Sequence, residues 1–145
     1  MRVRPFQARD EVAWRRLFAG YIAFYRASVA EEVIDATWQR LISCGEGVLM
    51  GLLAVDEADA PIGLAHILFH RSTWSPSWYC YLEDLFVDPA QRSRGIGRAL
   101  IEAVYREADA RGATRTYWMT QESNATARAL YDQVATKTPF VQYRR

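Results

Sequence analysis

The chain has 145 residues, of which 50% are hydrophobic and 24% are charged. This length suits one domain with a single substantial core, so we predict one domain over residues 1–145. With 18 Lys and Arg against 17 Asp and Glu the net charge is only +1, which argues against disorder and against a surface for polyanions. We expect no nucleic-acid partner.

The first residues, from Met1 to Phe6, hold no apolar signal core, and no later apolar run has the length needed to span a bilayer. We therefore expect a cytoplasmic protein with no membrane partner. Cys44 and Cys80 fall at a predicted helix end and in a predicted strand. That pattern is more typical of buried thiols than of a disulfide framework.

The N-terminal third of the chain predicts a strand followed by two helices. The strand covers residues 2–6. Apolar side chains at helical spacing, among them Tyr21 and Tyr25, predict the first helix over residues 10–27. The second helix begins near Ala30, carries two glutamates in its first turn, where negative charge is favoured, and runs towards Gly45.

The rest of the chain predicts further strands and helices. Three strands form an antiparallel meander and are separated by turn-forming residues; they cover residues 48–56, 62–70 and 78–87. They are followed by a helix over residues 95–111, a strand over 114–120, a helix from Asn124 and a short strand over 140–143. This order predicts an α/β domain with a mixed, mostly antiparallel sheet flanked by helices.

A glycine-rich loop joins the strand that ends at Val87 to the helix that follows it. Its sequence is Gln91-Arg92-Ser93-Arg94-Gly95-Ile96-Gly97-Arg98-Ala99-Leu100. Gly95 and Gly97 reach backbone angles closed to other residues, so consecutive N–H groups can surround a phosphate oxygen. The helix N-terminus adds free N–H groups and a partial positive charge, and three arginines bring further charge. We predict that this loop binds a pyrophosphate.

Neighbouring residues argue against two common phosphate-binding loops. A Walker loop needs a Lys-Ser/Thr pair after its last glycine, and Gly97 is followed by Arg98-Ala99. A dinucleotide fingerprint needs a third glycine where Leu100 stands and lies in the first strand-to-helix turn, whereas this loop lies past mid-chain. An ATPase, a GTPase and a dinucleotide enzyme are therefore disfavoured.

Two motifs in the expected order resemble the GNAT superfamily of N-acetyltransferases. Arg92, Gly95 and Gly97 match its Arg/Gln-x-x-Gly-x-Gly/Ala signature, and its Asn-x-x-Ala-x-x-Leu-Tyr helix matches the run Asn124-Ala125-Thr126-Ala127-Arg128-Ala129-Leu130-Tyr131. The resemblance implies that the loop binds the pyrophosphate of coenzyme A. It also implies that the strands over residues 78–87 and 114–120 splay apart to make a slot for the pantetheine arm.

Within the superfamily the chain is most similar to the branch of polyamine acetyltransferases and the yeast histone/polyamine and D-amino acid acetyltransferases. The shared runs are Tyr81-Leu82-Glu83-Asp84-Leu85 and Trp118-Met119-Thr120-Gln121-Glu122-Ser123-Asn124. Members of that branch are commonly dimers, so we expect a homodimer. The sequence departs from the family pattern at Val134-Ala135-Thr136, where an apolar-Gly-aromatic turn is usual.

The resemblance implies a set of residues that bind acetyl-coenzyme A. A backbone N–H of the strand would polarise the thioester oxygen, and the loop and the last helix would supply the other contacts. The set is Leu85, Phe86, Val87, Arg92, Ser93, Arg94, Gly95, Ile96, Gly97, Arg98, Asn124 and Arg128. Asn124 is also a good N-cap residue, and both roles can coexist.

A general base is expected, because an alkylamine with a pKa of about 10.4 must lose a proton before it attacks. Glu83 and Asp84 lie in an otherwise apolar strand, where burial would raise their pKa values towards neutrality. Strand alternation predicts Glu83 on one face with Tyr81 and Leu85, and Asp84 on the other with Leu82 and Phe86. The match to polyamine acetyltransferases favours Glu83 as the base. An ion pair or a turn cap is the alternative role for these acids.

A general acid is expected for the leaving thiolate of coenzyme A. Tyr131 matches the acid of the family motif, and an ordinary phenol pKa of about 10 suits that role. Without the motif, its place on a helical face with Ala127, Leu130 and Val134 would predict core packing.

Other clusters carry weaker signals. His66 and His70 share a strand face but lie about 13 Å apart at strand rise, too far for one metal ion, so we expect surface or packing residues and no metal. Cys80 has neither a predicted His partner nor a helix N-terminus that would make it an acetyl acceptor. Aromatic residues between Trp74 and Tyr81 predict either an amine-binding surface or packing.

These features predict an acetyl-coenzyme A dependent N-acetyltransferase. We expect it to acetylate a primary amine of a small molecule, polyamine or amino-acid-like, by direct attack in a ternary complex. Two alternatives stay open: a protein lysine or N-terminal acetyltransferase, and a non-catalytic acyl-coenzyme A sensor. The presence of both Glu83 and Tyr131 favours an enzyme over a sensor.

Overall fold

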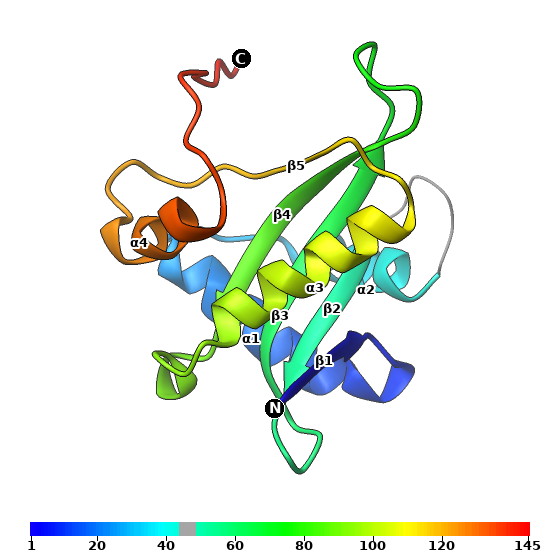
Figure 1. The fold of residues 1–145 in the computed structure, drawn as a ribbon. Coiled ribbons are helices and arrows are strands. Elements are labelled where there is room, and N and C mark those ends of the chain that lie inside the picture. The colour runs from blue at the N-terminus through cyan, green and yellow to red at the C-terminus, as the bar shows by residue number, and fades with distance from the viewer. Residues whose placement is uncertain (44–48) are drawn as a thin grey trace.

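A mixed sheet lies at the centre of the computed structural model, which describes residues 1–43 and 49–145 (Figure 1). Its strands are β1 (Arg2–Pro5), β2 (Met50–Val55), β3 (Pro61–His70), β4 (Tyr79–Val87) and β5 (Arg115–Tyr117). The α-helices are α1 (Glu11–Phe24), α2 (Glu31–Ile42), α3 (Ile96–Ala110) and α4 (Ala125–Val134), and two 3₁₀ turns, η1 (Ala8–Asp10) and η2 (Pro89–Gln91), complete the order.

The strands lie side by side in the order β1-β2-β3-β4-β5. The first four pair antiparallel, and β4 and β5 pair parallel, so the expected α/β fold with a mixed, mostly antiparallel sheet is confirmed. The parallel pairing covers only Tyr79–Tyr81 of β4 and Arg115–Tyr117 of β5. Beyond Tyr81 the long strand β4 continues for six residues without β5, as the expected splay requires.

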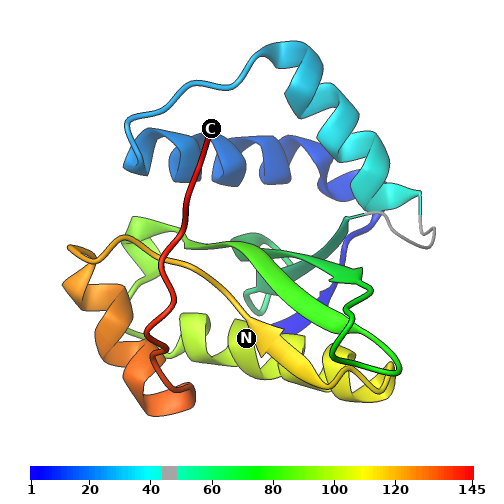
Figure 2. The same cartoon turned by 90° about the horizontal axis from the view of Figure 1, so that it is seen from above.

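Helices cover both faces of the sheet (Figure 2). Helices α1 and α2 pack on one face around a core that includes Trp14, Trp38, Leu53, Leu64 and Phe86. Helix α3 packs on the other face, where its apolar stripe meets alternate residues of β2, β3 and β4. Helix α4 has no fully buried residue and packs at the edge of this second core through Leu130, Tyr131 and Val134.

Two expectations at the C-terminal end were wrong. The strand predicted over residues 114–120 ends at Tyr117, where Trp118 turns its ring against Tyr131, with the ring centroids 5.4 Å apart. Residues 140–143 form no strand. Strand β5 offers only a three-residue edge, and the nearby Pro139 has no N–H to donate to a ladder.

The predicted end of the second helix near Gly45, the predicted strand start at Val48 and Cys44 lie outside the described residues. Within the described part of the chain, the element order matches the expected one except for the missing final strand. Helix boundaries differ from those expected by three residues or fewer, a difference that is usual because helix ends fray.

A buried ion pair ties the first strand to the start of α1. The Arg4 guanidinium donates to both carboxylate oxygens of Asp10, at 2.8 and 2.9 Å, and also to Asp59. Only 9% of the Arg4 side chain and 4% of the Asp10 side chain are exposed. The hydrogen bond from Arg4 holds the pKa of the Asp10 carboxyl below its usual range. The Asp10 carboxylate also accepts from the Gln7 backbone N–H at 2.7 Å, so it fixes the turn between β1 and α1.

We predict that Asp10→Ala destabilises the protein by about 3 kcal/mol, because it removes the more buried of the two carboxylates that pair with the buried Arg4 guanidinium and leaves only Asp59. Urea unfolding followed by circular dichroism measures this value. Asp109→Ala, an exposed substitution near the end of α3, should change the free energy of unfolding by less than about 0.5 kcal/mol. Equal effects of the two substitutions would contradict this account.

Candidate active site between strands β4 and β5

A β-bulge places the two predicted acids. In the pairing of β3 with β4, His66 lies opposite Asp84 and the next residue, Ile67, lies opposite Leu82, so Glu83 is an extra residue in β4. The bulge reverses the alternation of side chains: Leu82 packs in the core under α3, whereas Phe86 packs under α1. The prediction that Asp84 shares a face with Leu82 was therefore wrong, because simple alternation does not hold across a bulge.

A narrow cleft opens where β4 and β5 part. Glu83, Leu82 and Leu85 of β4 line one side of it, and Trp118 and Met119, which follow β5, line another. Tyr21 of α1, Tyr25 directly after α1 and Tyr131 of α4 complete the wall. The cleft has a volume of about 20 Å³, enough for one water molecule. The structure thus brings both predicted catalytic residues to one cavity.

Glu83 has the electrostatic surroundings of a proton acceptor. Glu83 is partly exposed, but the protein around it removes enough water to disfavour the charged form, and this desolvation raises its pKa. The negative charge of Asp84 raises the pKa further, and a positive charge on His66 would lower it. A carboxylate with a raised pKa holds a proton more readily than an ordinary glutamate does.

Tyr131 has the properties of a proton donor. Burial raises the pKa of its phenol to about 12, so the hydroxyl group is fully protonated at neutral pH. The ring packs edge to face on Trp118, with an angle of 69° between the ring planes. Among the described residues its hydroxyl has no hydrogen-bond partner, which leaves the proton free for a group in the cleft.

The loop before α3 presents a row of free backbone N–H groups. Ser93 and Gly95 both have positive φ angles, 64° and 75°. The first amide that bonds within the helix is that of Ala99, which donates to the Gly95 carbonyl at 3.0 Å. Within the described chain, no amide of residues 93–98 has a hydrogen-bond partner. This arrangement suits an anion.

Gly97 does not have the special backbone angle expected of it: it lies in the first turn of α3, its φ angle is not positive, and it serves a different purpose. A Cβ atom at this position would lie 3.2 Å from Cδ2 of Leu130, so the missing side chain lets α4 approach the start of α3. Ile96 is buried beneath the loop and anchors it to the core. The positive φ angle of Ser93 was not expected, because glycine is the usual signal for such an angle.

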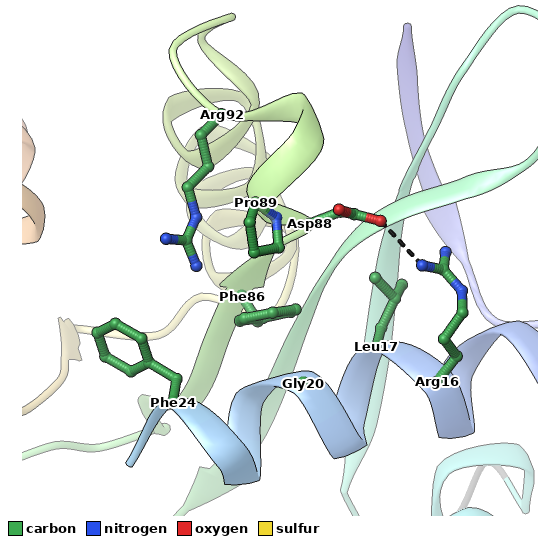
Figure 3. Close-up of a pocket in the computed structure, with 8 residues that line it drawn as sticks. All are labelled: Arg16, Leu17, Gly20, Phe24, Phe86, Asp88, Pro89 and Arg92. Atoms are coloured by element: carbon green, nitrogen blue, oxygen red, sulfur yellow. Dashed lines mark hydrogen bonds and ion pairs between the residues drawn. The ribbon is translucent and has the colours of Figure 1, made fainter. Parts of the chain in front are cut away.

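The predicted arginines do not all gather at these amides. The Arg92 Nε group donates to the Val87 carbonyl at 3.2 Å, and its guanidinium lies 5.8 Å from the ring centroid of Phe24 and 5.7 Å from that of Phe86. Figure 3 shows this side chain pointing across a neighbouring cavity of about 210 Å³ between α1 and the end of β4. Arg94 bonds to Gln91, and Arg98 bonds to Gln133 of α4.

Asn124 caps the last helix, as expected. Its side-chain oxygen accepts from the Ala127 amide at 3.4 Å, and its amide group donates to the Thr120 hydroxyl at 3.3 Å. Arg128 donates to the carbonyl oxygen of Glu122 at 2.6 Å. Both residues therefore hold the turn that leads from the cleft into α4.

Sequence reasoning missed the aromatic wall of the cleft. Tyr21 and Tyr25 were assigned to the apolar stripe of the first helix, where residues four apart share a face. It also missed the hydrogen bonds of His66. This residue is buried, as expected for a packing residue, but both of its ring nitrogens are hydrogen-bonded. Neither feature has a sequence signal of its own, because both depend on which residue of a neighbouring strand or helix lies opposite.

A family model of the acetyltransferase (GNAT) family matches residues 14–135, which is most of the chain. The chain belongs to this family. Its members are acetyltransferases, so the expectation of an acetyltransferase enzyme is confirmed, and the two motifs that suggested it lie at the loop before α3 and in α4.

Named relatives of this GNAT chain include D-amino-acid N-acetyltransferase HPA3 of Saccharomyces cerevisiae. It is 39% identical over 144 residues, covering 99% of this chain and 89% of the relative. The uncharacterized N-acetyltransferase YhfO of Bacillus subtilis is 30% identical over 145 residues, covering 99% and 95% of the two chains. Aminoglycoside N-acetyltransferase AAC(6')-Iy, solved with CoA, shares the fold with a TM-score of 0.83 at 20% identity, covering 99% and 92%.

No helix in the described ranges, 1–43 and 49–145, has both the length and the apolar character that a membrane span needs. The same ranges contain no group of three or more His, Cys, Asp or Glu side chains arranged to hold a metal ion.

The burial of Cys80 bears on whether its thiol could carry a covalent acetyl intermediate. It is fully buried in strand β4, and burial raises the pKa of its thiol to about 11. A thiol with that pKa is almost entirely protonated at pH 8, and only the thiolate is a good nucleophile. In a Cys44→Ser variant we predict no reaction of Cys80 with a thiol reagent at pH 8 within minutes, and complete reaction in 6 M guanidinium chloride. Rapid labelling of the folded variant would contradict the buried placement.

Proposed function

We propose that this GNAT enzyme transfers acetyl from acetyl-coenzyme A to a primary amine of a small molecule by direct attack. The observation that carries the proposal is that Glu83 and Tyr131, from two different elements, line one cleft at the point where β4 leaves β5. A proton acceptor and a proton donor are the two groups that amine acetylation requires.

Backbone groups of this chain fit a pantetheine diphosphate. The free amides of residues 93–98 would hold the pyrophosphate, and they begin where strand β4 and the turn η2 end. The open edge of β4 beyond Tyr81 has N–H groups without a partner strand, and those around Leu85 to Val87 would polarise a carbonyl oxygen in the cleft. Acetyl-coenzyme A supplies the activated acyl group as a thioester.

Glu83 would receive the proton of the acceptor. An alkylammonium must lose this proton before its nitrogen has a lone pair for attack. One water molecule between the carboxylate and the amine would relay this proton. The nitrogen would then bond to the acyl carbon while the C–S bond of the thioester breaks. Tyr131 would give its proton to the departing sulfur and regain one from the nitrogen, which loses its second proton as the amide forms, so the products are the amide and coenzyme A.

The relatives support a small acceptor. HPA3 is named for D-amino acids and AAC(6')-Iy for aminoglycosides, and both kinds of acceptor are small amines. The cleft is narrow and lined by tyrosines and a tryptophan, which suits one amine on a short chain better than an extended peptide. Homodimer formation and cytoplasmic location stay predictions from the resemblance and from the sequence.

Removal of either catalytic group should separate turnover from binding. We predict that Glu83→Gln and Tyr131→Phe each lower kcat by about 100-fold or more, with the Kd for coenzyme A changed less than threefold. Thiol release measures turnover against polyamines, amino acids of both hands and lysine peptides, and calorimetry measures binding. Unchanged kcat in both variants would contradict the assignment, and turnover restricted to peptides would replace the small acceptor by a protein.

The base should also be visible in the pH profile. Because the pKa of Glu83 is raised, kcat/KM should fall as the pH drops through a value above the ordinary glutamate pKa of about 4.3. Glu83→Gln should lose this acidic limb. An acidic limb that persists in Glu83→Gln would assign the titration to another group.

Two glycines provide a matched test of the loop. Gly95 and Gly112 lie at opposite ends of α3, have φ angles of 75° and 66°, and have no atom within 4 Å of an added Cβ. Substitution by Val should therefore destabilise the protein by a similar amount at either end, about 1–2 kcal/mol. Only Gly95→Val should weaken coenzyme A binding, by about tenfold or more, as measured by calorimetry. Equal weakening by Gly112→Val would show that the effect is general destabilisation.

A further inference from the structure

A chain of hydrogen bonds runs through the core from helix α1 to the acceptor side of the cleft. The Trp14 indole Nε1 group donates to Nε2 of His66 at 2.9 Å. Nδ1 of His66 lies 2.8 Å from a carboxylate oxygen of Asp84. Trp14 is completely buried and His66 is 1% exposed. These hydrogen bonds therefore connect residues of α1, β3 and β4 within the protein interior.

The chemistry of the three groups fixes where the protons lie. An indole N–H is only a donor, so Nε2 of His66 must be an acceptor and carries no proton. The ring is then neutral with its proton on Nδ1, and this N–H donates to the Asp84 carboxylate. A doubly protonated ring would point an N–H at the Trp14 N–H at 2.9 Å, which is not a hydrogen bond.

The surroundings of His66 also favour the neutral ring. Aromatic rings of Phe6, Trp14 and Phe18 surround it, with ring centroids 6.0, 6.1 and 5.2 Å away. No water can reach a ring buried to this extent, so an added charge would lose its hydration. Asp84, in contrast, keeps 15% of its side chain exposed at the end of the chain nearest the cleft.

Asp84 links these hydrogen bonds to the groups proposed to react. It follows Glu83 directly in the bulge of β4. Burial raises the pKa of the Tyr21 phenol, and the charge of Asp84 and a hydrogen bond to it raise that pKa further. Tyr21 lines the cleft together with Glu83. The charge on Asp84 therefore acts on both residues that face the acceptor.

We propose that Trp14 and His66 are positioning residues, which keep His66 neutral so that Asp84 acts as an uncompensated negative charge beside Glu83 and Tyr21. This charge makes Glu83 a stronger proton acceptor and attracts an ammonium group to the cleft. The proposal rests on the function assigned above to Glu83. The Trp14 indole touches no reacting atom, and it would affect the proton affinity of Glu83 through His66 and Asp84.

Other titratable groups also face Glu83 and Asp84 and contribute to the electrostatics of the cleft. They are Tyr21 of α1, Tyr25 directly after α1, His66 of β3, Tyr81 of β4, Tyr117 of β5 and Tyr131 of α4. Of this set, His66 alone would gain a positive charge by taking up a proton.

The first test reads the protons directly by ¹⁵N NMR of the histidine rings. The chain has only two histidines, so a His70→Gln background leaves the signal of His66 alone. We expect a neutral ring with the proton on Nδ1, as the two hydrogen bonds of the ring require. In a Trp14→Phe variant, Nε2 loses its donor and is free to accept a proton, so an imidazolium signal should appear. An imidazolium signal under the same conditions in the protein with Trp14 intact would overturn the proposal.

The second test measures the carboxyl pKa of Glu83 by ¹³C NMR. Trp14→Phe should lower it by about one unit, as should Asp84→Asn, because each removes the uncompensated negative charge next to Glu83. Trp38→Phe is the matched control. Trp38 is buried in the same cluster, with its ring centroid 5.2 Å from that of Trp14, but it makes no hydrogen bond to His66 in the described structure, so its substitution should leave the pKa of Glu83 unchanged. A shift in Asp84→Asn without one in Trp14→Phe would overturn the role of Trp14.

A conservative variant covers the case in which Trp14→Phe does not fold. In His66→Asn the side-chain amide can still donate to Asp84 but cannot become charged. The pKa of Glu83 should therefore stay as it is in the unsubstituted protein. A lowered pKa in His66→Asn would contradict the proposal. Neither NMR test depends on turnover, so both test this inference alone. Whether Glu83 is the base is decided separately, by the activity of Glu83→Gln.

Discussion

The β-bulge at Glu83 is the constraint on which the rest of the site depends. One extra residue in β4 moves the side chains that follow it to the opposite faces, so that Asp84 meets His66 under α1 while Leu82 stays in the core under α3. The bulge lies just past Tyr81, the last residue of β4 that pairs with β5. Bulges are common beside active sites because they redirect side chains and end strand pairing. Here both effects occur within three residues, and together they bring a carboxylate to an open strand edge.

Backbone groups do more of the cofactor recognition in this account than side chains do. The amides of residues 93–98 have no hydrogen-bond partner in the described chain, and the arginines beside them have other partners: Arg92 lies over Phe24 and Phe86, and Arg98 bonds to Gln133. A row of fixed amides binds an anion without the loss of side-chain entropy that a long arginine would suffer. The glycine at 97 matters for a different reason, since it lets Leu130 and α4, which carries Tyr131, pack against the start of α3.

Sequence reasoning predicted the fold because the signals for it are local, whereas the roles of Glu83 and Tyr131 came from the family resemblance and stay predictions. The helical spacing of α3, the special backbone angle of Gly95 and the Asn124 cap are properties of short runs, and the structure confirms them. Gly97, expected to share that angle, does not have it. The bulge, Tyr21 and Tyr25 in the cleft, and the hydrogen bonds that join Trp14, His66 and Asp84 are not local. Each depends on which residue lies opposite another in a neighbouring element, and a single residue of register changes the answer. The final strand was wrong for a similar reason: its residues have strand-like character, but β5 is too short to pair with them.

The most direct test of the central account is a map of coenzyme A binding by backbone amide NMR. Titration with coenzyme A should shift the amides of residues 93–98, of β4 from Leu82 to Val87, and of Trp118 and Met119, because these surround the open edge of β4 and the loop before α3. The account predicts that residues Leu17 and Gly20, which line the larger cavity beside Arg92, change little. Shifts centred on that larger cavity, with the cleft at Glu83 unaffected, would contradict it.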